Sequence, residues 1–166
     1  CEQNKKWQDM GIIPFSVAVN LSSNQFASDK LIDLVETVLR ETGLKPEYLE
    51  LEITETMTMD VKYAIPTLKK LHALGVTISI DDFGTGYSSM NYLTKFAINR
   101  LKIDRSFIWN IEKSISDSNI VKTIIRMAHN LGLKVIAEGV EDEKQLQFLQ
   151  EHGCDEVQGF YFSKPI

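Results

Sequence analysis

The residues of this sequence that could carry out chemistry stand at the ends of apolar, β-branched runs. In "ISIDDFGTGYSS" (residues 78–89), Asp81 and Asp82 are adjacent where such a run stops. Two like charges this close repel, so a cation, basic residues or solvent must compensate them. Asn20 and Glu52 end two earlier runs, and all four residues offer hard oxygen ligands. They suit Mg²⁺ or Mn²⁺, whereas zinc would want His or Cys.

Adjacent carboxylates also suit a pair of divalent cations about 4 Å apart that share ligands. Lys102 in "RLKI" and Glu138 at the end of "KVIAE" are two further ionisable residues in such runs. Lys102 could orient a water or offset phosphate charge, or form an internal salt bridge. Glu138 could act as a general base or merely cap the next helix. For Asp82 alone, a solvated loop or a helix cap is the simpler explanation, whereas the whole set favours a functional site.

The elements that must position these residues alternate along the chain. Helical patterns, the first of which looks like the last turns of a helix, lie between β-type runs. Ser28 is expected to cap the second helical pattern, and Pro66 to mark a kink or a late start in the third. The alternation predicts βαβ units and a parallel sheet. The expected strands are 15–20, 49–54, 76–80, 100–103, 134–138 and 156–160, and the expected helices 2–11, 29–43, 60–75, 116–132 and 141–153.

Strand parity sorts these side chains into two faces. One face is apolar and suited to packing under helices, and the opposite face ends in polar groups near the carboxyl end of each strand, where parallel β/α folds place their active sites. The apolar face comprises Val17, Val19, Leu51, Ile53, Ile78, Ile80, Leu101 and Ile103, and the polar ends are Asn20, Glu52, Asp81, Lys102 and Glu138.

An eight-stranded barrel needs about 250 residues, whereas this sequence supplies about six βα units in 166. We therefore expect an α/β fold of the TIM-like (β/α)₈ type that is incomplete here, with the first one or two strands missing. From the pattern alone, an open α/β sheet with an unrelated Mg²⁺-dependent activity is the alternative.

The bulk composition bounds the partners. The net charge is −5 and the pI near 5.2, which argues against binding to a DNA or RNA polymer. A phosphate substrate remains compatible, because bound metal ions invert the local field. The two cysteines, Cys1 and Cys154, have no metal-like spacing, and no apolar run approaches a membrane span. We expect a cytoplasmic domain, whose parent protein could still be tethered to a membrane upstream.

The glycines after the paired acids predict a loop that can move. Gly84 and Gly86 resemble a phosphate-binding loop only weakly, because the spacing is neither a Walker loop nor a dinucleotide fingerprint. We favour a mobile loop that closes over or reshapes the metal site. Glu55, three residues beyond Glu52, is expected to anchor a loop rather than bind a metal.

Six segments together carry a family resemblance: "SVAVNLSSNQF", "LELEITET", "ISIDDFGTGYSS", "LKIDRSFI", "VIAEGVE" and "VQGFYFSKP". From about residue 7 onward the sequence resembles the EAL-domain family of cyclic di-GMP phosphodiesterases. The resemblance implies a modified (β/α)₈ barrel and metal-dependent hydrolysis of cyclic di-GMP to linear pGpG. Residues 1–166 would be the C-terminal two-thirds of a single EAL domain. The Glu-Ala-Leu motif, whose glutamate is a metal ligand, is absent here, so this chain alone is expected to have little activity.

The resemblance also implies roles for individual residues. Lys102 matches the lysine that holds the catalytic water, and Glu138 the general base or water-orienting glutamate. Glu55 matches a brace of the DDFGTG loop, Asp104 an acid near the metals and Gln158 a residue that lines the site. The expected ligands of two Mg²⁺ or Mn²⁺ ions per complete site are Asn20, Glu52, Asp81 and Asp82.

In this family the DDFGTG loop and the helix after it connect the site to a dimer interface, so a homodimer is expected. The loop residues are Phe83, Gly84, Thr85, Gly86, Tyr87 and Ser88. A sensory or diguanylate-cyclase-like (GGDEF-type) domain is expected upstream in the parent protein. The alternative function is a catalytically degenerate EAL domain that acts as a cyclic di-GMP receptor or a protein-interaction module.

Overall fold

Six parallel strands form one continuous sheet in the computed structural model, which describes residues 1–86 and 90–164. They pair in chain order, each with the next along the sequence. A doubly wound open sheet would reverse its strand order at a switch point, and this one does not. The strands are β1 (Val17–Asn20), β2 (Leu49–Thr54), β3 (Thr77–Phe83), β4 (Arg100–Ile103), β5 (Lys134–Glu138) and β6 (Glu156–Gln158).

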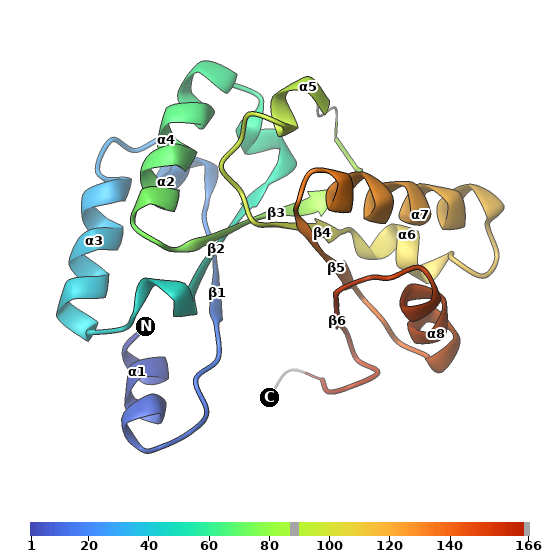
Figure 1. The fold of residues 1–166 in the computed structure, drawn as a ribbon, viewed down its shortest axis with the longest axis horizontal. Coiled ribbons are helices and arrows are strands. Elements are labelled where there is room, and N and C mark those ends of the chain that lie inside the picture. The colour runs from blue at the N-terminus through green and yellow to red at the C-terminus, as the bar shows by residue number, and fades with distance from the viewer. Residues whose placement is uncertain (87–89, 165–166) are drawn as a thin grey trace.

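The helices follow one another around the strands (Figure 1). This arrangement and the unreversed strand order confirm the expectation of an incomplete (β/α)₈ barrel, here a half-barrel. The α-helices are α1 (Glu2–Asp9), α2 (Ser23–Phe26), α3 (Leu31–Thr42), α4 (Val61–Ala73), α5 (Met90–Leu93), α6 (Arg105–Trp109), α7 (Ile115–Asn130) and α8 (Glu143–Glu151), and the 3₁₀ turns are η1 (Pro46–Tyr48) and η2 (Glu55–Thr58). None of the helices in the described part of the chain is long and apolar enough to span a membrane.

The apolar face predicted from parity is the core between strands and helices. Its side chains on β2, β3 and β4 are buried: Leu51, Ile53, Ile78, Ile80, Leu101 and Ile103. The prediction is wrong for Val19, which is 39% exposed. Its strand, β1, is an edge of the described sheet and packs mainly against β2. Parity therefore identifies which way a side chain points, but not whether a helix covers it.

Local signals place most element boundaries within a few residues, with three corrections. The helix expected from residue 29 begins at Leu31 with Lys30 as its N-cap, because the Ser28 hydroxyl accepts a hydrogen bond from the Lys30 amide and so closes a turn before the helix. Helix α4 begins at Val61 and continues through Pro66. The third strand does not stop at Ile80 but continues through both aspartates to Phe83.

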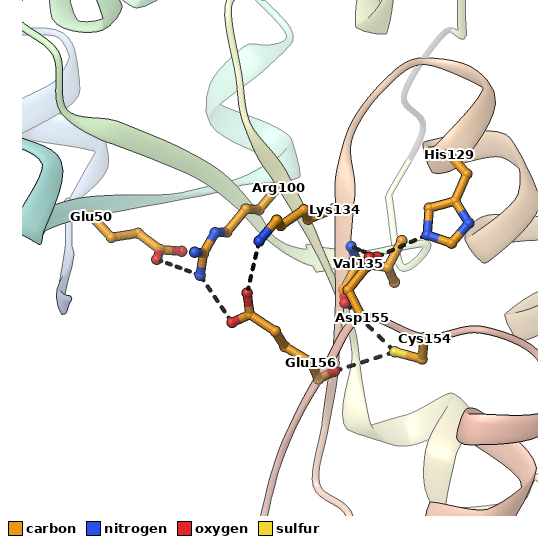
Figure 2. Close-up of polar contacts among 8 residues, drawn as sticks. All are labelled: Glu50, Arg100, His129, Lys134, Val135, Cys154, Asp155 and Glu156. Carbon is orange, nitrogen blue, oxygen red and sulfur yellow. Dashed lines mark hydrogen bonds and ion pairs between the residues drawn. The ribbon is translucent and has the colours of Figure 1, made fainter. Parts of the chain in front are cut away.

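One polar contact ties the end of α7 to the sheet (Figure 2). Asp155 Oδ2 accepts the Val135 amide proton at 2.8 Å and lies 2.8 Å from His129 Nε2. Burial acts to raise the pKa of the Asp155 carboxyl, but the bonds from His129 and Val135 outweigh it and hold this pKa below its ordinary value. Next to it, burial raises the pKa of the Cys154 thiol to about 11, so this cysteine stays protonated at neutral pH.

Replacing Asp155 with asparagine tests the contribution of this carboxylate to stability. The folded pKa lies below the unfolded value near 3.9, so the stabilisation is present above that pH and is lost as pH falls through the folded pKa. We expect Asp155→Asn to lower the free energy of unfolding by about 1 kcal/mol near pH 6. In urea titrations the difference between the two proteins should begin to shrink as pH falls below about 4 and should vanish below the folded pKa. The exposed Asp29→Asn is the control; an equal effect there, or a pH-independent difference, would refute this role.

Candidate active site

Lys102 stands at the centre of the predicted site. It is 4% exposed, and its Nζ lies 2.7 Å from Glu52 Oε1, 2.6 Å from Glu138 Oε1 and 3.3 Å from Asp81 Oδ1. Burial alone would lower the pKa of the ammonium, but the bonds to Glu138 and Glu52 outweigh it and raise the pKa above its ordinary value. One fixed positive charge therefore holds three carboxylates from β2, β3 and β5, and the cluster keeps a net negative charge.

Asp82 reaches the same cluster through an irregular backbone. Successive side chains in a regular strand point to opposite faces, which would turn Asp82 away from Asp81. However, the β3–β4 register shifts between Ile80 and Phe83, and Asp82 has φ = 54°, in the left-handed region. Oxygens of Asp81, Asp82 and Glu138 consequently lie within 4.8 Å of one another. Partial burial and the charges of Asp81 and Asp104 raise the pKa of Asp82.

These oxygens fit a divalent cation. Carboxylates bound to Mg²⁺ or Ca²⁺ lie about 2.0–2.6 Å from the ion, so oxygens of one such ion lie within about 5 Å of each other. The Asp81, Asp82 and Glu138 oxygens meet this condition. Burial, together with the charges of Asp81 and Glu52, raises the pKa of Glu138 against the opposing effect of Lys102, so further positive charge would stabilise the cluster.

The remaining predicted ligands lie on the two neighbouring strands. Glu52 is 7% exposed and joins the cluster through Lys102. Asn20 pairs with Glu52 across β1 and β2, and its side chain is exposed at the sheet edge. The structure therefore brings Glu52, Asp81, Asp82 and Glu138 together around Lys102, with Asn20 beside them in register.

The carboxylate of Glu55 binds the backbone of the loop that contains Gly84 and Gly86. It is 4% exposed, and its Oε2 accepts hydrogen bonds from the Gly84 amide at 3.1 Å and the Gly86 amide at 3.0 Å. A Cβ on Gly86 would lie 2.9 Å from the Glu55 carboxyl carbon, so only glycine allows this approach. Thr85 closes the turn by donating to the Asp82 carbonyl, and Phe83 is buried. Tyr87 and Ser88 lie outside the described residues.

Asp104 and Gln158 border the site. The Asp104 carboxylate caps α6 by accepting the Ser106 amide proton at 2.9 Å, and it also lies close to Asp82. Gln158 ends β6 in register with Glu138 and is exposed. The alternative role of Glu138 as a helix cap is wrong, because Asp142 caps α8.

A cavity of about 200 Å³ opens between Glu138 and Gln158, and sequence reasoning did not anticipate its other wall. There, the Arg105 guanidinium lies over the Trp109 ring, 4.9 Å from its centroid. Both residues belong to α6, which packs against β5. Nothing in the strand pattern marks them, because they follow the last residue of β4.

Removing the central ammonium should expose the repulsion it offsets. In Lys102→Met, three carboxylates remain clustered without their cation, and we expect the free energy of unfolding in EDTA to fall by about 3 kcal/mol at pH 7. Urea denaturation measures the change. Lys134→Met, which loses only an exposed contact of 3.8 Å to Glu156, is the control and should change stability by less than about 1 kcal/mol. Similar stability of the two variants would show that Lys102 does not hold the cluster together.

Comparison with known proteins agrees with this geometry. The family model described as the EAL domain matches residues 1–165. The chain is 50% identical over its whole length to the signaling protein YkoW of Bacillus subtilis, of which it covers 21%. It is 44% identical over its whole length to the bifunctional diguanylate cyclase/cyclic di-GMP phosphodiesterase MucR of Pseudomonas aeruginosa, of which it covers 24%.

Among solved structures, the PaMucR phosphodiesterase in complex with c-di-GMP superposes with a TM-score of 0.97 at 44% identity, over 100% of this chain and 68% of that one. The chain spans less than a quarter of the length of YkoW and of MucR, the two curated relatives named above. The family match over residues 1–165, together with the half-barrel, shows that this chain belongs to the EAL domain family.

Proposed function

We propose that the domain hydrolyses cyclic di-GMP to linear pGpG in bacterial second-messenger signalling. The observation that carries the proposal is the cluster of Glu52, Asp81 and Glu138 around Lys102, with Asp82 beside it, at the carboxyl end of the half-barrel of an EAL domain. MucR of Pseudomonas aeruginosa, a relative of this family, carries the name of a bifunctional diguanylate cyclase/cyclic di-GMP phosphodiesterase, and the PaMucR phosphodiesterase is solved in complex with c-di-GMP.

In this proposal the site is metal-dependent. Asn20, Glu52, Asp81 and Asp82 would hold divalent cations, and their oxygen donors favour Mg²⁺ or Mn²⁺. When bound, such cations neutralise phosphate charge and make water a better nucleophile. The cluster's net negative charge attracts the cations. Once they are bound, their positive charge offsets the carboxylates, and the site can accept an anionic substrate.

The protein's own groups would position and deprotonate the attacking water. Lys102 would donate to that water with the N–H that now faces Asp81 at 3.3 Å, while its other contacts to Glu52 and Glu138 hold the ammonium in place. Glu138 would take the water proton, because its carboxylate lies beside Asp81 and Asp82 and is held in place by Lys102. The new bond forms between the water oxygen and one phosphorus, the opposite P–O bond to the ribose breaks, and the leaving oxygen gains a proton. One water is consumed for each pGpG formed.

The cavity beside Glu138 would receive a part of the dinucleotide. Its wall carries the stacked Arg105 and Trp109 on one side and Gln158 on the other, so it offers a flat aromatic surface and hydrogen-bonding groups. Glu55 would keep Asp82 in place by fixing the backbone of the loop that follows it.

The proposal extends to the domain's setting. We infer a homodimer through the DDFGTG loop and α5, which follows that loop directly. The chain covers less than a quarter of relatives named as signalling proteins or bifunctional enzymes, which supports a sensory or diguanylate-cyclase-like domain elsewhere in the parent protein. Its unpaired cysteines, Cys1 and Cys154, favour a reducing, cytoplasmic setting.

Substitution of Glu138 by glutamine tests the assignment in the EAL-domain protein that carries this sequence. We expect kcat for pGpG formation to fall about 100-fold or more, because the base is lost, while cyclic di-GMP binding persists. Chromatographic separation of cyclic di-GMP from pGpG measures turnover, and calorimetry measures binding. Glu143→Gln, an exposed change on α8, should leave both unchanged. Full turnover by Glu138→Gln would refute the role of Glu138. A wild-type protein that binds without turnover would instead be a receptor.

A further inference from the structure

A second charged tier, formed by Arg100, Glu50 and Glu156, lies one layer below the Lys102 cluster on β2 and β4. Figure 2 shows its contacts, and none of the roles above uses them. Arg100 Nη1 lies 3.1 Å from Glu50 Oε2 and 3.1 Å from Glu156 Oε2. Lys134 Nζ adds a longer contact of 3.8 Å to Glu156. The tier therefore joins β2, β4 and β6 through one guanidinium.

The two tiers have the same layout. Arg100 and Lys102 are two residues apart on β4, and Glu50 and Glu52 are two residues apart on β2, so each pair shares the inner face of the sheet. In both tiers the cation on β4 reaches over β3 to a glutamate on β2. Toward the other edge, Arg100 reaches over β5 to β6, while Lys102 reaches Glu138 on β5.

These contacts depend on the curvature of the sheet. Neighbouring strands lie about 4.8 Å apart, so β2 and β4 would be about 10 Å apart on a flat sheet, as would β4 and β6. A concave inner face brings the ends of such side chains together. Conversely, a guanidinium that binds carboxylates on both sides restrains that curvature, and the curvature sets how close Glu52 and Glu138 lie one layer above.

Ser79 on β3 lies between the two tiers. It pairs in register with Glu52 on one side and Arg100 on the other, and it is fully buried.

Glu50 is a buried carboxylate that contacts the guanidinium of Arg100. It is 3% exposed, and its second oxygen, Oε1, has no hydrogen-bond partner among the described residues. Within the described part of the chain, Arg100 is its one ionic partner. A buried carboxylate stripped of such a partner is costly and must take up a proton, reach solvent or find another cation, so loss of Arg100 would remove what restrains β2 at this level.

We propose that Arg100 is a positioning residue for the active site, which acts by clamping Glu50 and Glu156 and so holding Glu52, Lys102 and Glu138 at their spacing. The expected effect of the clamp on turnover rests on the proposed function. Its expected effect on cation binding can be measured whether or not the protein hydrolyses cyclic di-GMP. A displacement of about 1 Å at a reacting centre can cost about 100-fold in rate, so even partial relaxation of the sheet is measurable.

The experiment compares Arg100→Met with the double variant Glu50→Gln/Arg100→Met in the EAL-domain protein that carries this sequence. The single change leaves a buried charge unpaired, whereas the double change removes both charges and should restore the urea midpoint toward that of the wild type. Three quantities are measured: the urea midpoint, the affinity for Mn²⁺ from the electron paramagnetic resonance signal of free Mn²⁺, and kcat and KM for cyclic di-GMP.

If Arg100 positions the site, the double variant regains stability but stays about tenfold lower in kcat and several-fold weaker for Mn²⁺, with KM changed less than kcat. Arg100→Lys, which keeps a cation, should recover part of both losses, and the exposed Arg40→Met should lose neither. If the double variant regains wild-type kcat and Mn²⁺ affinity, Arg100 is only a structural residue and the proposal is overturned.

Two further outcomes are also decisive. Should the Arg100 variants fail to fold, Glu156→Gln opens only the exposed arm of the clamp and retains the buried pair; unchanged Mn²⁺ affinity and kcat in that variant would overturn the proposal. Should the wild type bind Mn²⁺ but not hydrolyse cyclic di-GMP, the proposed function fails, while the Mn²⁺ affinities of the variants still decide whether the clamp exists.

Discussion

The interaction on which the rest of the structure depends is the burial of one ammonium among three carboxylates. Lys102 contacts Glu52, Asp81 and Glu138 at 2.6–3.3 Å, and each carboxylate comes from a different strand. Such a cluster forms only if neighbouring strands are parallel and end at the same level, and if the sheet curves inward. The half-barrel meets both conditions. Burial of its apolar outer face stabilises the fold and so offsets the cost of desolvating a charged inner face.

An irregular backbone brings one further acid to the cluster around that ammonium. The left-handed backbone at Asp82 turns a second aspartate toward Asp81. Glu55 accepts the amide protons of the loop that follows and so resists its return to a regular strand. Strain of this kind, of order 1–3 kcal/mol at a non-glycine residue, persists where surrounding contacts enforce it, and it is commonest at functional sites.

Much of this arrangement could be predicted from sequence because parity is a strong constraint. Alternation within β2, β4 and β5 places Glu52, Lys102 and Glu138 on one face, and the parallel order follows from the helices between the strands. Asp82 could be grouped with the site but not placed, because a positive φ has no local sequence signal at aspartate. Parity also places Glu50 and Arg100 on the inner face, but both precede the strand ends where active sites form, so the strand-end pattern does not mark them. The exposure of Val19 depends on what packs over β1, which a local pattern does not contain.

The central claim is that this cluster is built to hold divalent cations between its carboxylates. Anomalous diffraction from crystals of the EAL-domain protein grown with Mn²⁺ tests it most directly. The account predicts anomalous peaks within about 2.3 Å of carboxylate oxygens of Asp81 and Asp82, with Glu52 and Asn20 among the ligands. The account would be contradicted if Mn²⁺ bound elsewhere in the domain, while the carboxylates stayed closed around Lys102 with no anomalous peak among them.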